Sequence, residues 1–276
     1  MDVEYTDEID ALINKMTGEK ILRHTCQLLT KDKKGKLKPH GSGVFIVIGE
    51  VHFMLTAAHV TKDWSDQNQL YIRIGKSNYV SLVGDLMETD LDKDEKTDLA
   101  YVKIDNRIIP DLQKPYIFLP LSKIRDHRKL LDGMNYCVMG YPEKSNAVID
   151  EKIEPIAQAY YLRPSPRKVY DYYKFPPETT FMFEMNGKGK NIKNGEIAKT
   201  GTHFYGISGC GVWLMIIDNS GPELSIDYRL IGIMTEFRNG KYFTLIGLRI
   251  KIILDGIMTF EKFNLREKKI TDKIAQ

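Results

Sequence analysis

Ser208 lies in the segment "TGTHFYGISGCGVWLMII", with glycines at positions 206 and 209 on either side of it. A serine hydroxyl is a weak nucleophile at neutral pH, and it attacks a carbonyl carbon only when a base lies within hydrogen-bond reach. That base is usually a histidine oriented by a carboxylate. The segment is therefore typical of either a nucleophile held on a glycine-rich turn or a small residue in a tight structural bend.

The positions of the histidines limit the order in which catalytic residues can follow one another along the chain. All six precede Ser208: His24, His40, His52, His59, His127 and His203. An α/β-hydrolase carries serine, acid and histidine in that order, which would leave Ser208 without a base. Its G-x-S-x-G motif is also absent, since Cys210 stands where the second glycine is required. The order histidine, acid, serine remains.

His59 and Asp98 are the best candidates for the base and its orienting acid. His59 follows an apolar strand pattern and two alanines in "LTAAHV", which predicts an imidazole at the end of a strand, facing a cleft. The acidic run "LMETDLDKDEKTD" is mostly a charged loop, but Asp98 opens the alternating pattern "DLAYVKI". A carboxylate there can be half-buried and fixed, as an acid that orients a histidine should be.

The elements that must position these residues are predicted to be β-strands. From Gly41 the chain contains short β-branched and aromatic runs separated by Gly, Asn, Asp or Pro, and Gly49-Glu50 has the character of a hairpin turn. This pattern favours antiparallel barrels or sandwiches and an all-β fold. Helices are expected only near the ends, in "TDEIDALINKM" and "IKIILDGIMTFEKF".

The motifs "GSGVFI", "LTAAHV", "TDLAYVKI", "GYP" and "GISGCGVW", in this order, resemble those of the trypsin/chymotrypsin-like serine peptidases, closest to the bacterial intracellular branch without disulfides. The resemblance implies two six-stranded antiparallel β-barrels with the active site between them. It implies a general base at His59, its orienter at Asp98 and an acylated nucleophile at Ser208. The backbone N–H groups of Gly206 and Ser208 would form the oxyanion hole.

The same resemblance divides the chain and outlines a substrate pocket. It implies an N-terminal helical extension and lead-in over residues 1–38, a first barrel over 39–120, a second over 121–255 and a C-terminal helix and tail over 256–276. The floor of the pocket falls on Thr202, with His203 beside it. The strand after "LIGIM" supplies Thr235, Glu236 and Phe237, and Thr235 can also hydrogen-bond Asp98.

The sequence departs from the family just before the serine. The usual residue there is Asp or Asn, and here it is Ile207, while Cys210 replaces a more frequent glycine. No "IVGG"-like start occurs for a zymogen switch. Two hypotheses follow: an active intracellular serine endopeptidase whose activity a protein partner or complex regulates, and a catalytically silent pseudopeptidase that binds peptides or proteins.

Composition limits the remaining function classes. Forty basic against 37 acidic residues leave a net charge of +3, which does not indicate nucleic-acid binding. No apolar stretch is long enough for a signal peptide or a membrane span. Three cysteines with no metal-ligand spacing fit reduced thiols. We therefore expect a soluble cytoplasmic protein that acts on a protein or peptide substrate, with no cofactor, metal, nucleic acid or membrane partner.

Overall fold

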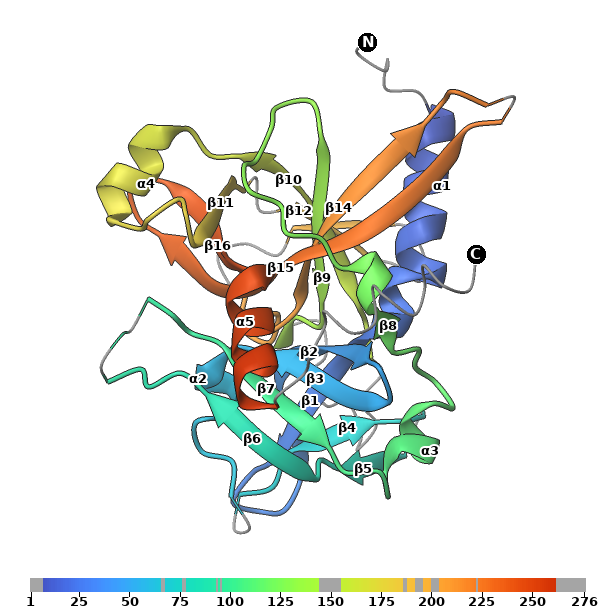
Figure 1. Cartoon of the computed structure of the whole chain (residues 1–276), viewed down its shortest axis with the longest axis vertical. Helices are drawn as coiled ribbons and strands as arrows, with labels where there is room; N and C mark the ends of the chain where they lie inside the picture. The colour runs from blue at the N-terminus through green and yellow to red at the C-terminus, as the bar shows by residue number, and fades with distance from the viewer. Residues whose placement is uncertain are drawn as a thin grey trace, which may run out of the picture.

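The computed structural model describes residues 7–65, 68–75, 78–92, 94, 96–143, 155–185, 188–191, 196–199, 204–221 and 223–261. Two β-sheets lie one above the other, and the helices lie on their outside (Figure 1). The lower sheet is built from the first half of the chain and the upper sheet from the second half, so the two units follow one another in sequence (Figure 1).

The first sheet has the strand order β5-β4-β1-β2-β3-β7-β6, and the short β8 pairs with β2. Its strands are β1 Thr25–Lys31, β2 Leu37–Ile48, β3 Val51–Thr56, β4 Tyr71–Arg73, β5 Tyr79–Ser81, β6 Gly84–Glu88, β7 Ala100–Ile104 and β8 Leu119–Pro120. The hairpin between β2 and β3 turns at Gly49-Glu50, as predicted, and Gly49 has a φ of +62°. β1 lies within residues 1–38, which the sequence assigned to a lead-in before the first barrel.

The second sheet has the order β11-β16-β15-β14-β9-β10, followed by the hairpin of β12 and β13. Its strands are β9 Asn135–Gly140, β10 Gln158–Pro164, β11 Thr180–Glu184, β12 Lys188–Asn191, β13 Ile197–Lys199, β14 Gly211–Asp218, β15 Ser225–Asn239 and β16 Phe243–Arg249. β10 also pairs with β11, which closes the first six of these strands into a barrel.

The predicted all-β fold of two barrels is thus confirmed, with one correction. The second unit is a closed six-stranded barrel, whereas the first is a half-barrel, because no pairing joins β5 to β6 among the described residues. Short elements connect the strands: η1 Ile21–His24, α2 Ala58–Thr61, α3 Ile109–Leu112, η2 Leu121–Lys123 and α4 Arg167–Tyr173.

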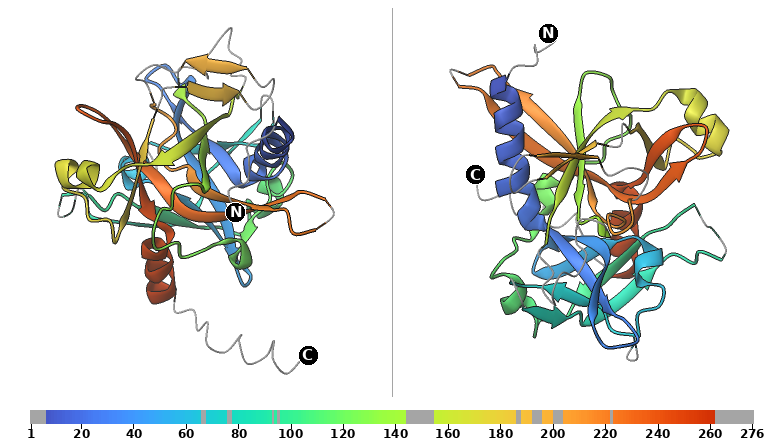
Figure 2. Two further views of the ribbon diagram at one scale, coloured as in Figure 1. Left: turned by 90° about the horizontal axis from the view of Figure 1, so that it is seen from above. Right: turned by 180° about the vertical axis from the view of Figure 1, so that it is seen from behind.

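Helices near both ends of the chain pack against the sheets, as predicted. α1 (Asp7–Glu19) runs along the side of the second barrel and buries Ile9 and Ile13 (Figure 2). α5 (Ile250–Phe260) buries Ile253 and Ile257, one turn apart, in the apolar cluster that also contains residues of both sheets. No helix of the described part is long and apolar enough to cross a membrane.

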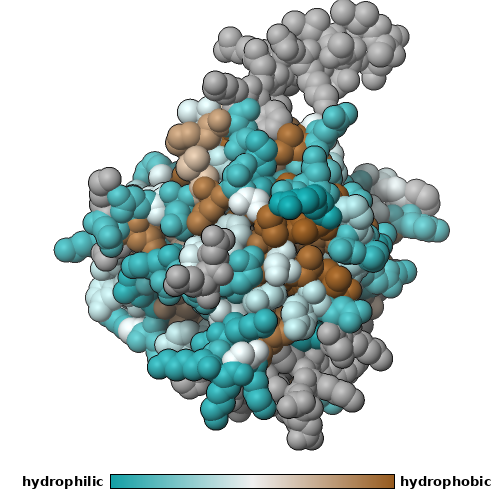
Figure 3. Space-filling view, turned by 90° about the horizontal axis from the view of Figure 1, so that it is seen from below, coloured by the Kyte–Doolittle hydropathy of each residue, from teal (hydrophilic) through white to brown (hydrophobic). Residues whose placement is uncertain are grey.

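The core joins the two units. One apolar cluster combines Phe53 and Leu55 of the first sheet with Trp213 and Leu230 of the second, all of them buried. Separate clusters fill the first half-barrel and the second barrel. Hydrophilic side chains cover most of the face seen from below, with apolar side chains gathered near its middle (Figure 3). Because the shared cluster fixes the two sheets against each other, side chains from both can form one site.

Candidate active site

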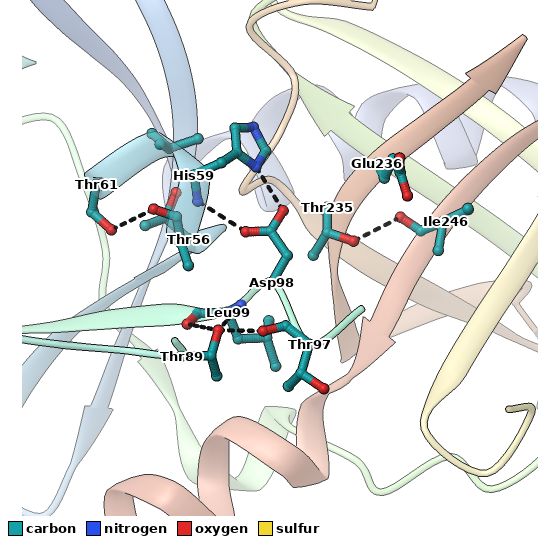
Figure 4. A network of polar contacts seen from close by, with 12 residues as sticks. Thr56, His59, Thr61, Thr89, Thr97, Asp98, Leu99, Thr235, Glu236 and Ile246 are labelled. Atoms are coloured by element: carbon teal, nitrogen blue, oxygen red, sulfur yellow. Dashed lines mark hydrogen bonds and ion pairs between the residues drawn. The ribbon is translucent and has the colours of Figure 1, made fainter. Parts of the chain in front are cut away.

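His59 and Asp98 form a hydrogen-bonded pair at the edge of the first sheet. β3 ends at Thr56, and the single-turn α2 that follows carries His59. Asp98 lies two residues before β7, the strand that pairs with β3, so the two side chains meet. Nδ1 of His59 lies 2.6 Å from Oδ2 of Asp98, and the backbone N–H of His59 donates to Oδ1 at 2.9 Å (Figure 4).

The exposure of this pair differs between its two members. The side chain of His59 is 44% exposed and that of Asp98 only 13%. A carboxylate that accepts both hydrogen bonds from one residue fixes the rotamer of the ring and keeps the proton on Nδ1. Nε2 is then left as the acceptor, on the part of the ring that solvent and substrate can reach.

A cavity of about 680 Å³ brings Ser208 to the same place. Its lining includes His59, Asp98 and Ser208 together with Leu91, Lys96, Phe175, Phe204, Tyr205, Met234, Thr235, Glu236, Phe237 and Asn239. The cavity thus draws on both halves of the chain. Ser208 Oγ forms no hydrogen bond with another described residue. In unliganded enzymes the contact between nucleophile and base is often loose and tightens only when substrate binds.

Ser208 sits on a turn that two glycines make possible. Gly206 and Gly209 have φ values of +89° and +87°, in the region that residues with a Cβ rarely adopt. A Cβ on Gly209 would lie 2.1 Å from Thr56 Oγ1 and 2.2 Å from the Ser42 carbonyl oxygen. Gly209 N–H donates to the Met234 carbonyl at 2.8 Å. The turn is therefore pressed against the first sheet, where no larger residue fits.

The N–H groups of Gly206 and Ser208 have no acceptor among the described residues. The carbonyl of Tyr205 accepts from Glu143 N–H at 2.8 Å. Because a trans peptide directs its C=O and N–H to opposite sides, this bond turns the Gly206 N–H away from Glu143. Two unpaired donors on one turn are what stabilisation of a developing oxyanion requires.

Ile207 is fully buried in the apolar cluster of the second barrel, which also contains Val138, Phe204 and Cys210. Its N–H donates to the Phe204 carbonyl at 3.3 Å, and its carbonyl accepts from Cys210 N–H at 3.1 Å. Apolar packing therefore occupies the position where the peptidases that the sequence resembles carry a polar residue. Cys210 packs in the same cluster, and Cys26, Cys137 and Cys210 are all free and buried. Burial raises the pKa of the Cys137 thiol to about 12.

Of the five residues predicted to border the substrate, three line the cavity and two lie outside the described residues. Thr235, Glu236 and Phe237 line the cavity. The Thr235 hydroxyl donates to the Ile246 carbonyl at 3.5 Å and not to Asp98, which corrects that expectation (Figure 4). Glu236 forms an ion pair with Arg238 at 2.6 Å. Thr202 and His203 lie outside the described residues.

Sequence reasoning identified Phe237 but missed the other aromatic residues of the cavity. Phe204 and Tyr205 line it, and their only signal was their closeness to Ser208. The rings of Phe204 and Phe237 contact each other with centroids 4.6 Å apart, so they fill space beside the serine. Phe175 comes from a Pro- and Tyr-rich segment with the character of a surface loop.

The other described histidines are engaged elsewhere. His24 contacts the Ile117 carbonyl and the Tyr228 hydroxyl, His40 the Val60 carbonyl, and His127 the Tyr136 hydroxyl. The ring of His52 packs edge-on against Phe118. Of all the described histidines, only His59 lines the cavity. No group of three or more His, Cys, Asp or Glu side chains in the described part of the chain is arranged to hold a metal ion.

Comparison with solved structures bears on the fold. The chain is similar to the protease Anisep from Arthrobacter nicotinovorans, at 12% identity and a TM-score of 0.47, over 82% of this chain and 90% of the other. It is similar to the thermostable serine protease AL20 from an extremophilic microorganism, at 12% identity and a TM-score of 0.48, over 82% and 91%. A third match, the scabies mite inactivated protease paralogue S-D1, has 12% identity, a TM-score of 0.50 and coverage of 87% and 93%.

The chain has the chymotrypsin-like fold. At 12% identity this likeness concerns the fold alone, and one of the similar proteins is described as inactivated. No family model and no curated protein matches the sequence. The geometry around Ser208 is therefore what bears on activity.

Proposed function

We propose that this chain is a serine endopeptidase that cleaves peptide bonds through Ser208, His59 and Asp98. The observation that carries the proposal is the His59–Asp98 pair, with 2.6 Å between Nδ1 and Oδ2, which opens onto the cavity that Ser208 also lines. A largely buried carboxylate, a half-exposed imidazole and a serine on a glycine turn supply an orienter, a base and a nucleophile.

The reaction begins when Ser208 Oγ attacks the carbonyl carbon of the substrate while His59 Nε2 takes the hydroxyl proton. The carbonyl oxygen becomes an oxyanion, to which the N–H groups of Gly206 and Ser208 donate. Loss of one such donor typically costs about 2.7–4 kcal/mol in the transition state. The imidazolium, stabilised by Asp98, then gives its proton to the leaving amine.

Hydrolysis of the acyl-enzyme repeats these steps with water. His59 takes a proton from a water molecule that attacks the ester carbon, and then returns it to Ser208 Oγ as the acid product leaves. The aromatic and polar lining of the cavity suits a peptide substrate. The rings of Phe204 and Phe237 occupy space beside the nucleophile, so we propose that residues with small side chains at the cleaved bond are preferred.

A fluorophosphonate probe, which phosphonylates activated serines, tests the proposal. Wild-type protein should be labelled on Ser208, and Ser208→Ala and His59→Ala should not be labelled. Ser220→Ala is the matched control, because it removes an exposed serine hydroxyl that, among the described residues, bonds to Asp218 alone. Absence of labelling in wild type would instead favour a pseudopeptidase that binds peptides or proteins.

Location and regulation are further proposals. Three free, buried thiols support a reducing compartment such as the cytoplasm. Regulation by a protein partner stays a prediction, and the contacts that hold the Ser208 turn come from this chain itself. Digestion of casein by the purified chain at a rate that an added cell extract does not change would count against a regulatory partner.

A further inference from the structure

Ser42 is a fully buried residue in β2 of the first sheet, in the "GSG" sequence at positions 41–43. We propose that Ser42 is a positioning residue that fixes the turn of Ser208 relative to His59. The inference rests on the proposed function, and it adds a residue to which that function assigns no role. Four hydrogen bonds connect Ser42 to both parts of the site.

Three of these bonds reach from Ser42 into the second half of the chain. The Ser42 hydroxyl donates to the Gly206 carbonyl at 2.7 Å and accepts from Tyr141 N–H at 3.1 Å. The backbone N–H of Ser42 donates to the Ser208 carbonyl at 2.9 Å. Ser42 therefore holds carbonyl groups on both sides of Ile207, within the turn that presents the nucleophile.

The hydroxyl bond fixes one side of Gly206, and a different bond fixes the other. The peptide before Gly206 is held by the bond between Glu143 N–H and the Tyr205 carbonyl, and the peptide after it by Ser42 Oγ. Glycine at a φ of +89° has no side chain to limit its rotation. Without the Ser42 hydroxyl, the Gly206 peptide would lose one of two anchors that set the direction of its N–H.

The fourth bond connects Ser42 to the strand that leads to the base. Thr56 Oγ1, at the end of β3, donates to the Ser42 carbonyl at 2.8 Å, and His59 follows three residues later. A single buried residue thus bridges the nucleophile turn and the segment of the histidine. Displacement of a reacting group by about 1 Å can cost about 100-fold in rate, so such a bridge has a measurable effect on catalysis.

The test compares Ser42→Ala with Thr17→Ala, which removes an equally buried hydroxyl from α1, on the outside of the second barrel. For Ser42→Ala we expect kcat on a peptide substrate and the rate of fluorophosphonate labelling to fall about 10- to 100-fold, with KM within about twofold of wild type. Thr17→Ala should lose thermal stability but keep kcat. A kcat of Ser42→Ala within twofold of wild type, or a loss confined to KM, would overturn the inference.

Hydrogen exchange of the amides of Ile207, Gly209 and Cys210 supplies a readout that does not depend on activity. These amides bond to carbonyls within the turn or on β15. Their exchange should become faster in Ser42→Ala and stay unchanged in Thr17→Ala, and unchanged exchange in Ser42→Ala overturns the inference. If wild type resists labelling while this exchange effect is present, the proposed function fails but the positioning role stands. Ser42→Cys, with a weak donor of similar size, replaces Ser42→Ala should that variant not fold.

Discussion

Ile207 gives the sharpest prediction about how the nucleophile turn is held. Its side chain is fully buried among Val138, Phe204 and Cys210, at the position where the peptidases that the sequence resembles carry an acid or an amide. If apolar packing holds the turn, then Ile207→Ala should weaken it and Ile207→Asp should weaken it more. If the position still served an ion pair, the acidic variant would be tolerated.

The expected loss of unfolding free energy follows from the burial of Ile207. Replacing a fully buried isoleucine by alanine costs about 2–5 kcal/mol of unfolding free energy, which is a large part of the roughly 5–15 kcal/mol available to a domain. Ile207→Asp loses the same contacts and also buries a carboxyl among apolar side chains, which adds several kcal/mol while the group is charged. Burial would raise the pKa of that carboxyl above its unfolded value of about 3.9. The destabilisation should therefore be smallest below about pH 4 and grow as the pH rises above it.

Urea unfolding and kcat, measured on the same samples, separate a loss of stability from a loss of activity. Ile72→Ala is the matched control, because Ile72 is equally buried but belongs to the core of the first sheet. It should lose similar stability while keeping kcat for the folded fraction, whereas Ile207→Ala should lose both. The reasoning is refuted if Ile207→Asp is as stable and as active as wild type at neutral pH, or if Ile207→Ala loses less than about 1 kcal/mol.

Four further predictions concern separate parts of the site and the fold. Gly209→Ala should cost more than about 3 kcal/mol in urea unfolding, since its Cβ meets backbone, whereas Gly35→Ala, with a φ of +77° and open space around it, should cost only about 1–2 kcal/mol. Asp98→Asn should lower kcat by about 10³- to 10⁴-fold with little change in KM, because the amide favours the wrong tautomer of the imidazole. Phe237→Ala should raise kcat/KM for substrates with a large aromatic residue at the cleaved bond by about tenfold or more relative to alanine substrates. Burial lowers the pKa of His24, so folding favours its neutral form. Stability should therefore be lost as the pH falls below about 6.5. His24→Gln should reduce the difference between the melting temperatures at about pH 5 and pH 7.5.

The parts of the fold that the sequence predicted are those with a local signal. The β2–β3 hairpin has a glycine at its turn, and α5 has apolar residues that recur on one face. β1 was missed as a strand of the first barrel. All but its last residue, Lys31, are buried, so it shows no alternation of polar and apolar residues. Sequence periodicity identifies a strand only when one of its faces meets water.

In the candidate site, too, some residues could be predicted from the sequence and others could not. His59, Asp98 and Ser208 could be proposed because residue type and chain order limit which groups can do the chemistry. The role of Ser42 could not, because its hydroxyl contacts lie 99 and 164 positions away at Tyr141 and Gly206. A hydrogen bond of that separation has no periodicity or motif to mark it in a single sequence.

The contacts around Ile207 and Ser42 together bear on whether cleavage of the chain or binding of a partner is needed to form the site. An acid at the position of Ile207 depends on a cation that reaches it, and such a contact can be made or withheld. Apolar burial has no such partner, and the polar tether comes from Ser42, a residue already fixed in the middle of β2. The Ile207 anchor forms as the second barrel closes, and the Ser42 tether forms as the two sheets pack together. The turn of Ser208 should therefore be as stable as the second barrel and its contact with the first sheet, and we expect control of activity to act on access to the cavity.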